Sequence, residues 1–218
     1  MNTKIYNTLR NRIIYLEYDP GQILKEQILA KEFGVSRTPL RTVLSRLEWE
    51  HLVKILPRTG IQVMELELNT ITNVFQARLE LEAVIGTMAA ERFTKLHFNR
   101  LDACLIACEQ QLDNKDPRTL AALDMEIKHL FYEAAGNPFL IEMSDRLYSL
   151  TFRLWYFNMI KMDNKGWNQE VLAIKEDLAN LVDLLNNNTP EQVGMARKAH
   201  LLKHLKRIRS KFLGLSDF

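Results

Sequence analysis

The chain has 218 residues, of which 47% are apolar and 26% are charged, so it can bury a sizeable core in one or two domains. Its formal net charge of +2 is too small to indicate nucleic-acid binding by itself. No apolar run approaches the length of a membrane-spanning helix and the N-terminus does not read as a signal peptide, so we expect a soluble cytoplasmic protein.

The charge is distributed unevenly along the chain. Residues 1–66 hold ten of the 29 Lys and Arg residues and seven of the 27 Asp and Glu residues, which gives this part a net charge of +3. The remainder holds 19 basic and 20 acidic residues, a net charge of −1. The difference is modest, and it is consistent with an N-terminal region that contacts DNA.

Residues 29–47 have the pattern of a helix-turn-helix. Gly34 suits the tight bend after a first helix, Ser36 is a good N-cap for a second, and Pro39 falls in the first turn, where its missing N–H costs nothing. Apolar residues then recur three and four apart, so one face packs inward. A helix of this size fits the major groove of DNA, and its first residues reach base edges. The residues of this helix predicted to contact DNA are Ser36, Arg37, Thr38 and Arg41.

Beyond this helix, two short β-prone runs at 52–56 and 61–64 flank a Pro-Arg-Thr-Gly turn. An ordinary amphipathic helix with a solvated cationic face would explain the arginines, but it would not explain the hairpin. A hairpin directly after a recognition helix is the wing of a winged helix-turn-helix, which we predict over residues 1–66. Further predicted DNA contacts are Gln27 of the preceding helix and Arg58, Thr59 and Gly60 of the wing tip.

Four motifs occur in order within residues 5–64: Asp19-Pro20-Gly21, the run 34–41, Arg46-Leu47-Glu48 and the turn 57–60. In this order and spacing the region resembles the GntR family of bacterial transcription regulators. The resemblance implies that a twofold homodimer binds a pseudo-palindromic operator in double-stranded DNA. It also implies that Arg37 and Arg41 are the main base-reading residues.

Residues 69–213 lack strand alternation and show helical periodicity that is broken at polar segments such as Gly136-Asn137-Pro138. Six helices with short connections predict an antiparallel bundle, so the fold class is mainly α. Bundle cores are a common place for a small-molecule or metal pocket. The helices are predicted near residues 69–93, 97–113, 117–135, 138–160, 167–187 and 190–213.

Four groups of residues form a pattern in this second region: Arg78-Leu79-Glu80 with Glu82, Asp124, Gly136-Asn137 twelve residues later, and Arg197 with His200. Over residues 70–205 the chain therefore resembles FCD, the ligand-binding and dimerisation domain of the FadR branch of the GntR family. Many FCD domains bind a divalent metal through one Asp and three His inside the bundle. Such a set leaves open positions where a carboxylate effector completes the metal shell.

The chain departs from this metal-binding pattern at two positions. Asp124 and His200 occupy ligand positions, whereas Lys128 and Leu178 stand where the other two His are expected. A protonated amine is a poor ligand and leucine is none, so we expect no cofactor and no tightly bound metal. His129 is a poor substitute, because it points about 140° away from Asp124 around the helix.

Lys128 suggests a different way of binding an effector. Asp124 stands four residues earlier, so the two side chains can pair, and the resemblance directs both toward the bundle interior. The ammonium would then take the place of the metal and bind a small carboxylate. An equally weighted alternative is a plain salt bridge in a pocket that has lost its ligand. The predicted effector-binding residues are Arg78, Asp124, Lys128, Asn137, Arg153 and His200.

An enzyme is disfavoured, because the sequence has no Gly-rich phosphate loop, nucleophile elbow or paired Cys-His arrangement. Cys104 and Cys108 are expected to be reduced and partly buried. The sequence therefore predicts a ligand-responsive DNA-binding transcription regulator, with repression as its provisional mode of action. The alternatives are an effector-independent DNA-binding protein with a vestigial pocket and a metal-dependent enzyme.

Overall fold

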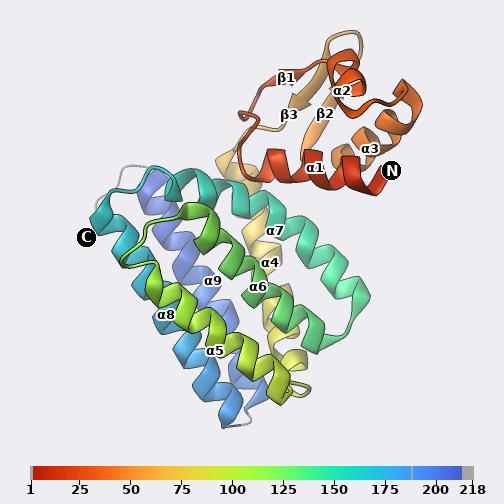
Figure 1. Cartoon of the computed structure of the whole chain (residues 1–218). Coiled ribbons are helices and arrows are strands. Elements are labelled where there is room, and N and C mark those ends of the chain that lie inside the picture. The colour runs from red at the N-terminus through yellow and green to blue at the C-terminus, as the bar shows by residue number, and fades with distance from the viewer. Residues whose placement is uncertain (1, 188, 213–218) are drawn as a thin grey trace. The chain divides into compact units, whose positions relative to one another are not determined.

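The structure is a computed structural model that describes residues 2–187 and 189–212. This part of the chain is mainly helical, with nine helices and one three-stranded sheet (Figure 1). It divides into two compact units, the first formed by the described residues up to 74 with 148–154, the second by 75–147 and the described residues from 155 onward. None of the described helices combines the length and the apolar character that crossing a bilayer requires.

The N-terminal part of the first unit is a winged helix-turn-helix, as predicted. Helix α3 packs against α1, α2 and the strand β2 of a small antiparallel sheet, in which β3 lies between β1 and β2. The strand pair β2–β3 is the wing, and its register places Leu56 opposite Gly60. The elements are α1 (Asn2–Ile14), β1 (Ile23–Leu24), α2 (Glu26–Phe33), α3 (Arg37–Trp49), β2 (Val53–Leu56) and β3 (Gly60–Val63).

The turn between α2 and α3 follows from two residues that the sequence indicated. Gly34 takes a left-handed conformation, with φ of 62°, and its N–H bonds back to Lys31 at the end of α2. Ser36 is extended and begins α3 as its N-cap, although its side chain makes no capping hydrogen bond. The inward face of α3 is buried as predicted and consists of Leu40, Val43, Leu44 and Leu47.

Two carboxylates hold α3 in place. Glu50 is buried and accepts a hydrogen bond of 2.6 Å from the Tyr6 hydroxyl, and it lies 3.2 Å from Arg46 Nε. Burial, together with the bond to Glu50, raises the pKa of Tyr6 to about 12. Glu48 accepts the backbone N–H of Ile55 at 2.7 Å and so ties the wing to α3. Arg46 and Glu48, two residues of the family motif, therefore have structural roles here.

The remaining six helices form the predicted bundle, except that residues 68–74 of α4 and 148–154 of α7 belong to the first unit. In the bundle α5 packs between α6 and α8, and α8 packs on α9 (Figure 1). Helix α5 begins earlier than predicted, because Thr94 and His97 form a capping box. Helix α8 also begins earlier, because Asp163 accepts the Gly166 N–H at 2.7 Å. The predicted end at residue 213 lies outside the described residues. The helices are α4 (Leu68–Ala90), α5 (Lys95–Gln110), α6 (Pro117–Ala135), α7 (Pro138–Met159), α8 (Asn164–Asn186) and α9 (Pro190–Phe212).

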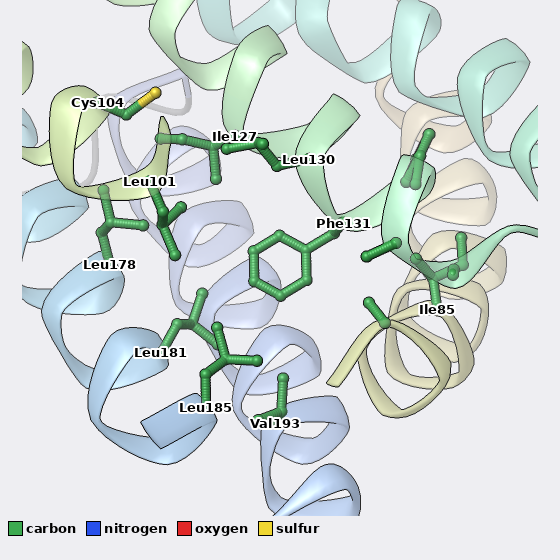
Figure 2. Close-up of a cluster of buried hydrophobic side chains, with 14 residues drawn as sticks. Ile85, Leu101, Cys104, Ile127, Leu130, Phe131, Leu178, Leu181, Leu185 and Val193 are labelled. Carbon is green, nitrogen blue, oxygen red and sulfur yellow. The ribbon is translucent and has the colours of Figure 1, made fainter. Parts of the chain in front are cut away.

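The apolar core of the bundle is centred on Phe131 of α6 (Figure 2). Leu178 and Leu181 of α8 point into this cluster, and Leu101 of α5 faces them from the opposite helix (Figure 2). Cys104 also belongs to the cluster and is a free, buried cysteine, as predicted. Its burial raises the pKa of its thiol, so it behaves as a small apolar residue.

Helices α4 and α9 approach closely at a pair of glycines. A Cβ on Gly86 would lie 2.9 Å from the Gly194 Cα, and a Cβ on Gly194 would lie 2.5 Å from the carbonyl oxygen of Ala83. Only glycine fits at such a distance. This crossing allows Arg197, about one turn after Gly194, to reach Glu82 of α4.

Candidate functional site

The N-terminal end of α3 exposes three polar side chains. Ser36, Arg37 and Thr38 are all exposed, and the Ser36 hydroxyl is not used for capping. Within the described part of the chain, the Arg37 side chain has no hydrogen-bond or ion-pair partner. These groups are therefore available to a ligand such as DNA, and their contact with bases or phosphates stays a prediction.

Arg41 points to the same solvent-exposed side but is already paired. Its Nε donates to Glu26 Oε1 at 2.7 Å, and its Nη2 donates to Glu26 Oε2 at 3.2 Å. Sequence reasoning did not single out Glu26, although it opens α2 and stands next to the exposed Gln27. Glu26 and Arg41 are 15 residues apart and lie on different helices, so the three- or four-residue spacing of pairs within one helix could not indicate this ion pair.

The wing tip combines an exposed cation with a constrained backbone. Arg58 is exposed and takes a left-handed conformation, with φ of 62°. The carbonyl oxygen of Thr59 accepts a hydrogen bond of 2.8 Å from Lys25 Nζ, which joins the tip to the start of α2. Gly60 has a structural reason to be glycine, because a Cβ there would lie 2.5 Å from the Leu24 carbonyl oxygen of β1.

Arg58→Gly separates backbone strain from charge at the wing. Glycine adopts the left-handed conformation without the cost of roughly 1 kcal/mol that another residue carries, so the folded protein should be as stable or slightly more stable. If Arg58 contacts a phosphate, the same change should weaken DNA binding and lower the salt dependence by about one charge. Thermal melts and binding titrations at several salt concentrations measure both effects. Unchanged DNA binding would remove Arg58 from the interface.

Inside the bundle the structure brings together a buried group that we call the Glu82 cluster: Arg78, Glu82, Tyr132 and Arg197. The Tyr132 hydroxyl donates to Glu82 Oε1 at 2.8 Å, and Arg78 Nη2 lies 3.6 Å from the same oxygen. Arg197 Nη2 donates to the other carboxylate oxygen. The predicted effector residue Arg78 is therefore part of an ion cluster whose other members come from α4, α6 and α9.

The Glu82 cluster favours the ionised carboxylate. Burial alone would raise the pKa of Glu82, but the positive charges of Arg197 and Arg78 outweigh it, so the pKa is lowered. The guanidinium of Arg197 also lies 4.1 Å from the centre of the Phe131 ring. Its Nε is buried and has no hydrogen-bond partner within the described residues, which leaves a donor for another anion.

Lys128 is buried, with an exposed fraction of 5%, as the resemblance implied. Its Nζ lies 2.5 Å from Asp145 Oδ1 of α7 and 5.2 Å from the centre of the Tyr132 ring. The sequence indicated Asp124 as a partner of Lys128, which stays a prediction, and it did not indicate Asp145. A buried ammonium requires a nearby anion, and Asp145 supplies one.

The sequence predicted that His200 and Leu178 lie beside Lys128 at one site. In the structure their neighbours are other residues. His200 Nε2 lies 3.4 Å from Asp177 Oδ1 and 3.2 Å from the amide nitrogen of Asn180, both on α8. Burial lowers the pKa of His200, although Asp177 opposes this. Leu178 packs into the apolar cluster around Phe131 and does not close a polar site.

Two further predicted effector residues have structural roles. Asn137 is the N-cap of α7, and its side-chain oxygen accepts the N–H groups of Phe139 and Leu140, each at 3.2 Å. Arg153 falls in the first unit, where its Nη2 donates to the Met64 carbonyl oxygen at 2.5 Å. Burial lowers the pKa of Arg153 to about 10. We therefore leave Asn137 and Arg153 out of the effector site.

A second buried carboxylate, Glu170, is fully paired. It accepts from Trp155 Nε1 at 3.0 Å and from Arg207 Nε at 3.1 Å, and His204 Nδ1 lies 3.4 Å away. These contacts join α7, α8 and α9, so we assign this network to stability. Within residues 2–187 and 189–212, no three His, Cys, Asp or Glu side chains come together as a metal ion would need.

Comparisons with known proteins cover both regions. Residues 2–63 match the family model of bacterial regulatory proteins, gntR family, and residues 73–203 match the model of the FCD domain. The Escherichia coli (strain K12) HTH-type transcriptional repressor GlaR is 28% identical over 182 residues, which cover 79% of each chain. The transcriptional regulator YieP from the same strain is 30% identical over 178 residues, 71% of this chain and 75% of YieP.

Two solved structures share the fold over nearly the whole chain. E. coli McbR/YncC superposes with a TM-score of 0.84 at 18% identity, and the match covers 97% of this chain and 98% of that one. A transcriptional regulator from Rhodococcus sp. RHA1 superposes with a TM-score of 0.74 at 17% identity and covers 99% of each chain. At these identities the likeness establishes the arrangement of helices and strands.

Proposed function

The chain belongs to the GntR family of bacterial regulatory proteins and carries an FCD domain, and from this premise we propose that it binds a pseudo-palindromic operator as a homodimer and responds to a small carboxylate. Its relatives are DNA-binding transcription regulators and not enzymes. The name of GlaR supports repression as the mode of action. Such a regulator acts on DNA in the cytoplasm.

The exposed N-terminal end of α3 carries the DNA-binding part of this proposal. Arg37, Thr38 and Arg41 lie on the side of α3 that its buried leucines leave free, at the end of the helix that enters the major groove in winged domains. One short helix contacts too few bases to select an operator. A twofold dimer doubles the contacts and accounts for two half-sites.

The variant carrying both Arg37→Ala and Arg41→Ala tests this assignment. Each arginine that contacts guanine contributes about 1–3 kcal/mol of base discrimination, so the double variant should lose its preference for a selected operator over random duplex DNA. Both side chains are exposed, so the melting temperature should change little. Competition binding between selected and scrambled duplexes measures the preference. Retained selectivity would contradict the proposal.

The effector part of the proposal rests on the unpartnered Nε of Arg197, which adjoins the Glu82 cluster. Arg78, Arg197 and Lys128 bring three positive charges to the bundle interior, where Glu82 and the half-exposed Asp145 supply two negative charges. The buried Arg197 Nε, which has no hydrogen-bond partner within the described residues, favours an anionic ligand. The site needs no metal in this proposal, because cationic side chains supply the positive charge that a metal would.

Lys128→Met tests the effector site in melts with a panel of small mono- and dicarboxylates. A ligand present at about 100 times its Kd adds about 2.7 kcal/mol to stability, so the wild-type melting temperature should rise, with or without a chelator. Lys128→Met should show a much smaller rise. The matched control is Lys175→Met, since Lys175 pairs with Glu109 at 2.5 Å on the exposed surface. A rise that the chelator abolishes would show that binding requires metal.

A further inference from the structure

We propose that Glu26 is a positioning residue for Arg41, which it fixes so that only the outer edge of the guanidinium can contact a base. The inference rests on the proposed function, because Arg41 meets a base only if α3 enters the groove of DNA. It adds to that function a carboxylate that determines specificity without touching the DNA itself.

The geometry of the pair defines which donors remain. Glu26 occupies the side edge of the guanidinium, with Oε1 accepting from Nε at 2.7 Å and Oε2 from Nη2 at 3.2 Å. Three N–H groups are left. One N–H of Nη1 and the second N–H of Nη2 lie in parallel along the outer edge of the guanidinium, and the other N–H of Nη1 points toward the Cδ side. Two parallel donors on that edge match the O6 and N7 acceptors of guanine in the major groove.

The surroundings hold Glu26 more firmly than Arg41. The Glu26 side chain is 23% exposed, whereas that of Arg41 is 65% exposed. Glu26 is also the first residue of α2, where the unpaired N–H groups of the helix stabilise a negative charge. A long, exposed arginine samples many rotamers when it is free, and a bidentate carboxylate restricts it to one.

The ion pair also changes which part of DNA attracts Arg41. The guanidinium of Arg41 and the carboxylate of Glu26 together carry little net charge, so the pair is only weakly attracted to phosphates and the base contact becomes the main contribution of Arg41. Arg37 has no such partner within the described residues and keeps its full attraction to phosphates. The two arginines of α3 therefore contribute differently. Arg41 mainly discriminates between bases, whereas Arg37 contacts bases and also adds affinity for DNA of any sequence through the phosphates.

Selection from a random duplex library with the full-length protein tests this inference. The wild-type protein should select a motif with a strongly preferred guanine in each half-site, and Glu26→Gln should lower that preference roughly tenfold. Glu26→Gln should also bind a scrambled duplex more tightly and with a steeper salt dependence, since Arg41 becomes free to contact phosphates. Removing a negative charge raises binding to any duplex by itself, so a positioning role is marked by the loss of base preference together with this rise.

Two controls make the result specific. Glu32→Gln removes the same charge from the same helix, where Glu32 pairs with Arg12 at 2.5 Å, and it should keep the full motif. In an Arg41→Ala background, Glu26→Gln should change no base preference, because Glu26 acts through Arg41. An unchanged motif in Glu26→Gln, or a further loss in the Arg41→Ala background, would overturn the inference. Failure of the wild-type protein to select any motif would instead contradict the proposed function.

Discussion

Glu82→Ala should destabilise the protein by about 3–5 kcal/mol, the cost of removing one partner from a buried ion pair. The change leaves the guanidinium groups of Arg78 and Arg197 buried without their carboxylate, and it removes the acceptor of the Tyr132 hydroxyl. Chemical denaturation measures the free energy of unfolding. A loss below about 1 kcal/mol would mean that water reaches the cluster and replaces the carboxylate.

Glu80→Ala is the matched control for this change. Glu80 lies two residues earlier on α4 and pairs with Lys198 of α9 at 2.6 Å, but its side chain is 71% exposed. Exposed pairs contribute at most about 1 kcal/mol, so Glu80→Ala should leave stability nearly unchanged. The two variants compare an ion pair between the same two helices in a buried and in an exposed setting.

The effect of Glu82→Ala should depend on pH in a defined direction. The pKa of Glu82 is lower in the folded protein than in the unfolded chain, so its ionised form stabilises the fold at every pH above the unfolded value of about 4.3. This contribution is lost as the pH falls below that value toward the folded pKa. The difference in unfolding free energy between the wild-type protein and Glu82→Ala should therefore be full at neutral pH and shrink in acid.

Local patterns made the winged domain predictable. The buried face of α3, the bend at Gly34 and the hairpin at residues 57–60 each depend on residues close in sequence, and the structure has all three. Helix boundaries were predicted less well, because the caps at Thr94 and Asp163 stood inside segments that looked like breaks. A helix boundary depends on one capping side chain, whereas the helix itself is predicted from the apolar periodicity of many residues, so its ends are less certain than its existence.

Charge pairing was harder to predict, because partners come from different helices. Lys128 pairs with Asp145 across 17 residues, and Arg197 reaches Glu82 across 115 residues. The family pattern named Arg78, Glu82 and Arg197, but no spacing indicated that they meet. The position of Leu178 was equally hard to predict. The family pattern indicated only that a metal ligand is absent there, whereas the structure places Leu178 in the apolar core.

Gly194→Val should cost roughly 3 kcal/mol, at the upper end of the range for overpacking a well-packed core. A Cβ at this position would lie 2.3 Å from Thr87 Oγ1 and 2.5 Å from the Ala83 carbonyl oxygen, and that oxygen belongs to the α4 backbone. The backbone cannot yield without moving α4 away from α9. Met195→Val places the same side chain at a neighbouring position that is 62% exposed, and it should cost well under 1 kcal/mol.

The same clash should act on the Glu82 cluster, because Arg197 reaches Glu82 only across this close crossing. If α9 moves away, part of the loss caused by Gly194→Val is the loss of that ion pair. The double variant of Gly194→Val and Glu82→Ala should therefore be less destabilised than the two single variants together, by at least about 0.5 kcal/mol. Full additivity in chemical denaturation would mean that α9 keeps its place and absorbs the valine by another local change.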